Sequence, residues 1–232
     1  MKVLGIKQFH QKTFKFLKIK CERFSALLGK VPQHFIMVVY GFSGNGKTEF
    51  VMQLAKLLSK FGTVIWLSYE QRHGSDLQMA TLRNKMEERN GKFLVVDPIE
   101  NLDADTNLLD DLDAYLERRP SVKYVVIDSL DYTGFGWKEY SYLKEKYAGK
   151  KSFIFIAHST KTGSLKKAIS DRIIFDGGMG FFVQHFICHP EKNRYGGFTP
   201  YVVFEEKARE RNPTFFAKGK TKKTEENQGG KT

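Results

Sequence analysis

The chain has 232 residues, of which 41% are hydrophobic and 28% are charged. This length supports one α/β domain with a full hydrophobic core and is too short for two large domains. No stretch approaches the roughly 20 apolar residues that a membrane-spanning helix needs, which excludes an integral membrane protein. The two cysteines are too few for a disulfide scaffold or a four-cysteine zinc ribbon. The basic N-terminal segment has no signal-peptide pattern, so we expect a cytoplasmic protein.

The net charge of +12 is concentrated at the two ends of the chain. Residues 1–30 contain eight lysines and arginines against one glutamate, and residues 218–232 contain five lysines against two glutamates. The sequence between them is almost neutral. Basic ends on a neutral body favour a polyanionic partner, and nucleic acid fits this best. The alternative is that these lysines serve only solubility.

The N-terminal segment also carries an apolar stripe. Its residues are spaced by three and four positions, which predicts an amphipathic helix, and they are Phe14, Leu17, Cys21, Phe24 and Leu28. This stripe would pack either on its own domain or on a neighbouring subunit. We therefore divide the chain into a basic N-terminal arm (1–34), an α/β domain (35–216) and a disordered basic tail (217–232) that is almost devoid of hydrophobic residues.

From residue 35 onward, predicted strands and helices alternate. Apolar runs predict buried strands at 35–40, 63–68, 92–96, 124–128 and 153–157. Amphipathic patterns predict helices at 47–60, 77–89 and 105–118. Two further strands, at 181–189 and 200–206, have no helix between them. This order predicts a three-layer α/β fold with a mostly parallel central sheet and an antiparallel C-terminal edge.

The strongest motif is a glycine-rich loop between the first predicted strand and the first predicted helix of this domain. Residues 41–48 read GFSGNGKT and fit the pattern GxxxxGK(S/T). Glycines let the backbone N–H groups turn toward phosphates, and the helix N-terminus adds partial positive charge. The lysine would reach the β- and γ-phosphates, and the threonine hydroxyl would bind Mg²⁺. The candidate residues for ATP and Mg²⁺ are therefore Gly41, Ser43, Gly44, Asn45, Gly46, Lys47 and Thr48.

Two carboxylates end neighbouring predicted strands. Asp128 closes an apolar run, which is how a second Mg²⁺-holding carboxylate is presented in P-loop proteins. Glu70 follows the strand at 63–68, where a carboxylate can polarise a water molecule that attacks the γ-phosphate. Each residue alone is also consistent with an ordinary strand end facing solvent.

Two loops follow strands on the same edge of the sheet. Residues 132–140 are aromatic and rich in glycine, and residues 158–167 are polar and basic. Aromatic faces for base stacking, together with lysines for phosphates, predict a platform for single-stranded DNA. The candidate DNA-binding residues are Trp137, Lys138, Lys161, Lys166 and Lys167. Packing in the core or at an interface is an equal alternative for the tryptophan.

The last motif is KNRYGG at 192–197. Lys192 and Arg194 project to the same side of an extended segment and can contact a phosphate in their own or an adjoining subunit. The alternative is a solvated hairpin end. A nearby cluster of His185, Cys188 and His189 does not predict zinc, because alternation on one strand would separate the cysteine from the histidines.

Taken in order, GxxxxGKT, a strand-end glutamate, VVIDS, IAHSTKTG and KNRYGG resemble the RecA/DnaB superfamily of ATPases. The H-x-T-K-x-G loop and KNRYG are most similar to the ATPase core of RadA/Sms, whose pattern reads KNRFG. The resemblance covers about residues 35–206 and implies a RecA-like fold, ATP hydrolysis coupled to single-stranded DNA, and a homo-oligomeric ring or filament with nucleotide between subunits. The site residues that it implies are Lys47, Thr48, Asp128 for Mg²⁺, Glu70 as catalytic base, His158 at the nucleotide site, and Lys192 with Arg194 as the functional pair.

The leading hypothesis is a DNA-stimulated ATPase that moves or remodels single-stranded or branched DNA in recombination, repair or replication. The chain lacks the cysteines and the length for the zinc finger and Lon-like domain of RadA, and a basic arm replaces the scaffold domain of DnaB-type helicases. The alternative is an ATP-loaded DNA clamp or regulatory ATPase with slow turnover. A P-loop kinase would explain only the glycine-rich loop.

Overall fold

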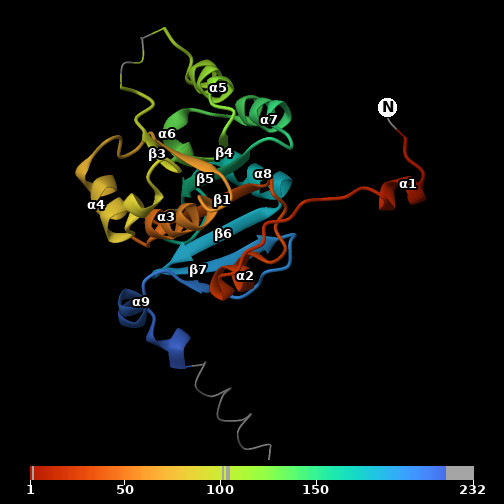
Figure 1. Ribbon diagram of the computed structural model, residues 1–232. Helices are drawn as coiled ribbons and strands as arrows, with labels where there is room; N and C mark the ends of the chain where they lie inside the picture. Colours follow the sequence, from red (N-terminus) through yellow and green to blue (C-terminus); the bar gives the residue numbers. More distant parts are fainter. Residues whose placement is uncertain (2, 101, 103–104, 218–232) are drawn as a thin grey trace, which may run out of the picture.

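The computed structural model describes residues 1, 3–100, 102 and 105–217 (Figure 1). Within these residues the strands form one eight-stranded sheet in the order β3-β2-β4-β5-β1-β6-β7-β8. The strands are β1 (Ile36–Gly41), β2 (Thr63–Ser68), β3 (Phe93–Val96), β4 (Val122–Asp128), β5 (Ser152–His158), β6 (Met179–Gln184), β7 (Ile187–Asn193) and β8 (Tyr201–Val202). All pairings from β3 to β6 are parallel, whereas β7 pairs antiparallel with β6 and with β8. The predicted parallel sheet with an antiparallel C-terminal edge is confirmed.

Helices cover both faces of this sheet (Figure 1). The helices of the described residues are α1 (Ile6–His10), α2 (Glu22–Leu28), α3 (Lys47–Leu58), α4 (Ser75–Arg83), the 3₁₀ helix η1 (Met86–Arg89), α5 (Leu108–Arg118), α6 (Leu130–Thr133), α7 (Trp137–Lys146), α8 (Ala168–Gly177) and α9 (Glu205–Arg211). Of these, α1 lies apart from the sheet (Figure 1). No helix in the described part of the chain is long and apolar enough to cross a membrane.

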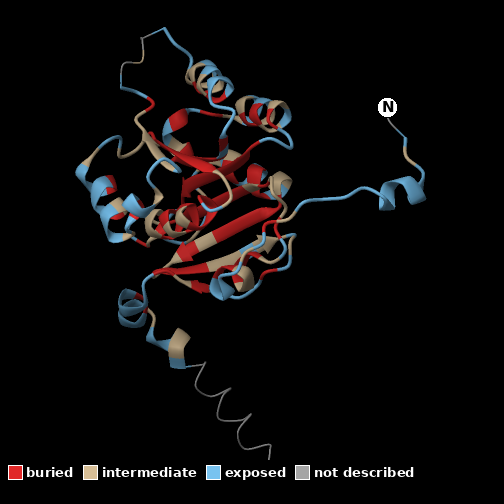
Figure 2. Ribbon diagram, in the orientation of Figure 1, coloured by how far each residue is buried: buried red, intermediate tan, exposed pale blue. Residues whose placement is uncertain are grey.

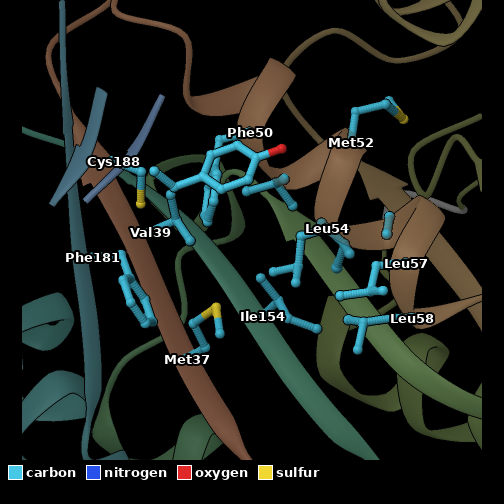
Figure 3. Close-up of a cluster of buried hydrophobic side chains, with 14 of the residues drawn as sticks. Met37, Val39, Phe50, Met52, Leu54, Leu57, Leu58, Ile154, Phe181 and Cys188 are labelled. Carbon is cyan, nitrogen blue, oxygen red and sulfur yellow. The ribbon is translucent and has the colours of Figure 1, made fainter. Parts of the chain in front are cut away.

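Alternating strand residues divide the core into two halves. Met37, Val39 and Ile154 face α3, whose Phe50 and Leu54 pack against them (Figure 3). On the other face, a second cluster joins alternate residues of the same strands to α5, α7 and α8. The central strands are therefore buried on both sides (Figure 2), which explains why they read as continuous apolar runs.

The C-terminal part of the fold differs from the predicted strands. The segment at 181–189 is not one strand, because β6 and β7 form a hairpin that turns at His185 and Phe186, with φ of 50° and 59°. His185 therefore lies in a turn and does not share a strand face with His189. The segment at 200–206 ends as a strand at Val202, and α9 begins at Glu205.

Helical segments also differ from the sequence expectations. The helix predicted at 77–89 is split into α4 and η1, and the loop predicted at 132–140 contains the end of α6 and the start of α7. We did not expect α8, which connects β5 to β6 and makes β6 a parallel neighbour of β1.

The single helix predicted for the N-terminal stripe is wrong. The segment between α1 and Glu22 is not helical, with Leu17 N donating to Val31 O at 2.9 Å, and only the second half of the stripe is helical. Leu17, Phe24 and Leu28 are buried in the α3-side core, whereas Phe14 and Cys21 are exposed. The stripe thus packs on its own domain, while most of the predicted tail, residues 218–232, lies outside the described residues.

Candidate active site

The glycine-rich loop joins the end of β1 to the start of α3, as the motif requires. Gly44 and Gly46 have φ of 74° and 95°, in the left-handed region that residues with a Cβ disfavour. A Cβ at Gly46 would also lie 2.7 Å from the Phe186 ring, and one at Gly41 would lie 2.2 Å from Val183 O. Gly41 and Gly46 must therefore be glycines, because they pack closely against the β6–β7 hairpin.

Lys47 is 7% exposed and folds back over the loop, where its Nζ donates to Phe42 O at 3.2 Å. Burial lowers the pKa of Lys47, while the carboxylates of Glu70 and Asp128 raise it. An anionic group in the loop would compensate this buried charge. Thr48, on the first turn of α3, lines the same cleft as Lys47.

Asp128 lies at the end of β4, directly beside Ser68 at the end of β2. It is 2% exposed, and its Oδ2 accepts no hydrogen bond from any residue that the structure describes. Burial, followed by the charge of Glu70, raises the pKa of Asp128 to about 7. A buried, unpaired carboxylate oxygen that lines a cleft with a threonine hydroxyl is the hard oxygen donor set that Mg²⁺ prefers. These residues fit the ion.

Glu70 lies just beyond β2, and its backbone N–H donates to Asp128 O at 3.0 Å. Its Oε2 lies 2.9 Å from His158 Nε2 at the end of β5. Burial opposes ionisation of Glu70, but the hydrogen bond and charge of His158 hold its pKa below its usual value. The carboxylate is therefore ionised near neutral pH and is oriented by the imidazole.

Lys47, Thr48, Glu70, Asp128 and His158 all line one cleft of about 820 Å³. The structure brings together the predicted residues Ser43, Gly44, Gly46, Lys47, Thr48, Glu70, Asp128 and His158 in this lining. Asn45 is buried behind the loop, where its Oδ1 accepts a hydrogen bond from His185 N at 2.8 Å. The arrangement combines a cationic glycine-rich loop, a carboxylate that fits Mg²⁺ and an ionised candidate base.

Lys192 and Arg194 are not at this cleft. Lys192 pairs with Gly180 on β6, and Gly180 pairs with Val38 on β1. The two cations therefore lie toward the N-terminal end of β1, whereas Gly41 lies at its C-terminal end. Lys192 Nζ and Arg194 Nη2 both donate to Phe175 O, each at 3.1 Å, which confirms that they project to the same side. They cannot contact a phosphate in the cleft of their own chain.

The candidate DNA-binding residues fall into separate groups. Lys166 and Lys167 line a second cavity of about 330 Å³ with Asp131, Tyr132 and His158. Lys161 lies 6.0 Å from the ring centre of Phe42. Trp137 and Lys138 begin α7, away from this cavity, and the Trp137 ring packs against Arg172 at 4.2 Å. Of the five residues, Lys166 and Lys167 line this cavity, and Trp137, Lys138 and Lys161 do not.

One wall of the cleft was missed by the sequence analysis. It is formed by Phe186 from the β6–β7 turn and by Phe204, Lys207 and Arg211 from the C-terminal segment. The spacing of the last three residues, by three and four positions, is a helical signal. The strand predicted at 200–206 includes the start of this segment, and this prediction obscures the helical pattern.

Comparisons with known proteins identify the fold. No protein-family model and no curated protein matches the sequence. Among solved structures, the crystal structure of a KaiC-like protein from the hyperthermophilic archaeon Pyrococcus horikoshii superimposes with a TM-score of 0.61. The match covers 81% of this chain and 92% of that chain at 18% sequence identity. The chain therefore has a RecA-like α/β fold of the kind found in this KaiC-like protein.

Proposed function

We propose that the chain is an ATPase that acts on single-stranded or branched DNA as a homo-oligomer. The observation that carries this proposal is the convergence of Lys47, Asp128 and Glu70 on one cleft, from the ends of three different elements. A glycine loop alone would bind phosphate. The added carboxylates supply the groups that hydrolysis needs.

Each residue has a definite role in this reaction. Thr48 and Asp128 would hold Mg²⁺, which supplies neutralisation of phosphate charge. Lys47 stabilises negative charge on the γ-phosphate, at the position where its burial already favours an anion. Glu70 accepts a proton from a water molecule. At the same time the oxygen of this water bonds to the γ-phosphorus of ATP, and the bond between the γ-phosphorus and the leaving ADP breaks. His158 holds the Glu70 carboxylate in its ionised form.

The DNA partner is supported by charge and by the second cavity. The basic ends of the chain favour a polyanion, and the second cavity places the ring of Tyr132 beside Lys166 and Lys167. His158 lines both cavities. A strand bound beside it would act on the residue that orients the candidate base.

An oligomer is supported by the position of the Lys192 and Arg194 pair. Their charges face away from the chain's own cleft and are held side by side by one carbonyl group. In a head-to-tail assembly such a pair would contact the γ-phosphate of the next subunit, as trans-acting arginines do in other P-loop enzymes. The RadA/Sms-like subtype belongs to the same proposal and rests on the KNRYGG motif.

The alternative is an ATP-loaded clamp with slow turnover. It is favoured by the Glu70–His158 contact, because a carboxylate engaged by an imidazole is a weaker proton acceptor than a free one. A phosphate-release assay with and without single-stranded oligonucleotide separates the two functions. The ATPase requires turnover that DNA stimulates and that Lys47→Ala abolishes. The clamp requires tight ATP binding with little turnover, and a protein that does not bind ATP would refute both.

A further inference from the structure

The nucleotide cleft continues beyond the phosphate loop to the wall formed by Phe186, Phe204, Lys207 and Arg211. We propose that this wall binds the base of the nucleoside triphosphate whose phosphates lie in the glycine loop. This inference rests on the proposed function, because it requires a nucleotide in the cleft. It assigns a role to α9, which none of the sequence motifs includes.

The wall is built by α9 and the residue that precedes it. Lys207 and Arg211 are four positions apart on α9, so their side chains share a side of the helix. Phe204 directly precedes the helix, and its ring centre lies 5.4 Å from Lys207 Nζ. Arg209 lies on a different side, where it forms an ion pair with Glu205 at 2.7 Å. Within the described residues, neither Lys207 nor Arg211 forms such a pair. Their charges are directed instead at aromatic rings.

The contacts in the wall are those that hold a planar heterocycle. Lys207 Nζ lies 5.2 Å from the ring centre of Phe186 and 5.4 Å from that of Phe204. The guanidinium of Arg211 lies 5.4 Å from the ring centre of Phe186. Phe204 is 43% exposed, so part of its ring remains open toward the cleft. An aromatic face with nearby donors offers stacking, together with hydrogen bonds to ring nitrogens.

The wall is fixed relative to the phosphate loop. Phe186 N donates to Asn45 O at 3.1 Å, and the Phe186 ring packs against Gly46. Val203 N donates to Phe186 O at 2.8 Å, and Gln53 Nε2 of α3 donates to Val203 O at 3.1 Å. These hydrogen bonds set the distance between the loop and Phe204. The wall is thereby held beside the phosphate loop in the lining of the same cavity.

The test compares two ligands that differ by the nucleoside. Mg²⁺ with ATP engages both loop and wall, whereas Mg²⁺ with inorganic tripolyphosphate engages only the loop. Isothermal titration should show that the wild-type chain binds ATP at least about tenfold more tightly than tripolyphosphate. Phe204→Ala should weaken ATP binding by roughly tenfold and leave tripolyphosphate binding unchanged, since a stacked base is lost. Phe204→Tyr should retain ATP binding.

Two controls make the result specific. Phe198→Ala removes another phenylalanine, 70% exposed and outside the cleft lining, and should leave both affinities unchanged. Arg211→Gln should weaken ATP binding alone, and it provides a second readout if Phe204→Ala lowers the melting temperature. Equal loss of both ligands, or no loss of either, would overturn the base-binding wall. If the wild-type chain binds both ligands equally, the wall is refuted while the ATPase proposal stands; if it binds neither, both fail.

Discussion

The Oε2 atom of Glu70 lies 2.9 Å from Nε2 of His158, and this contact connects the ends of β2 and β5 across the intervening strand β4. The backbone N–H of His158 donates to Asp131 Oδ2 at 2.8 Å, and both residues line the second cavity. The candidate base is thus oriented by a residue that also faces the proposed DNA site.

Glu70→Gln should reduce ATP turnover by about 10²-fold, because the variant cannot accept the proton of the attacking water. ATP binding should persist, since the glycine loop and Lys47 are untouched. Steady-state phosphate release and titration calorimetry measure the two quantities separately. Wild-type turnover in this variant would show that another group is the base.

His158→Ala should shift the acid limb of the kcat/KM profile to higher pH. Burial raises the pKa of Glu70, and the contact with His158, together with the Ser129 hydrogen bond and the charge of Lys47, more than offsets this effect in the wild-type chain. Without the imidazole the effect of burial is opposed less, so Glu70 takes up its proton, and activity falls, at a higher pH. His158→Gln keeps a hydrogen-bond donor and is the matched control, for which we expect a smaller shift. Identical acid limbs in all three proteins would contradict the assigned coupling.

Asp128→Asn should stabilise the ligand-free protein more at pH 8 than at pH 5. Burial raises the pKa of Asp128 to about 7, so the folded chain keeps a proton that the unfolded chain loses near pH 4. The free energy of unfolding of the wild type therefore decreases as the pH rises from about 4 to about 7. The variant has no such decrease, so its stability relative to the wild type is greater at pH 8 than at pH 5 by on the order of 2 kcal/mol. Urea unfolding at the two pH values measures the difference. The same variant should lose Mg²⁺-dependent ATP binding, and a pH-independent gain would indicate that Asp128 is already ionised.

Local sequence patterns are enough to predict the glycine-rich loop and the strands around it, because each of these parts is short. The glycine loop is specified by neighbours in sequence, and the buried strands on either side are specified by apolar runs. The hairpin turn at His185 and Phe186 could not be predicted in this way, since it contains neither glycine nor asparagine. Its left-handed residues are held by Asn45, which lies 140 positions earlier in the chain.

The N-terminal helix was predicted wrongly for a related reason. The spacing of its apolar residues fits a helix, but residues 15–17 instead pair with residues 31–33, where Gln33 N donates to Lys15 O at 2.9 Å. An extended chain with this partner still buries Leu17. Spacing alone does not distinguish the two outcomes, because the partner segment lies beyond the sequence window in which periodicity is read.

Trp137→Ala should lower the melting temperature and change the affinity for single-stranded oligonucleotide little. The ring is 37% exposed and packs between Arg172 and Tyr140, with ring centres of the two aromatics 5.2 Å apart. Lys166→Ala, in the second cavity, should weaken DNA binding and make it less dependent on salt, because one phosphate contact is lost. If Trp137→Ala keeps the wild-type melting temperature but loses affinity for single-stranded oligonucleotide, Trp137 stacks on a DNA base instead.

The shared active site is tested by mixing two inactive variants. Lys192 and Arg194 lie near the edge of the sheet opposite their own phosphate loop, so neither should affect ATP binding by an isolated chain. If they act on the next subunit, each stabilises charge that develops during transfer, and Arg194→Ala should reduce turnover by about 10³-fold or more.

Lys47→Ala removes the phosphate-binding lysine but leaves this pair intact. A mixed oligomer contains interfaces at which the intact loop of one chain meets the intact pair of the other, so activity should reappear on mixing and increase with protein concentration. Native mass spectrometry establishes that the two variants assemble together. If they do so and the mixture stays inactive, the pair has only a structural role, and the site is not shared between subunits.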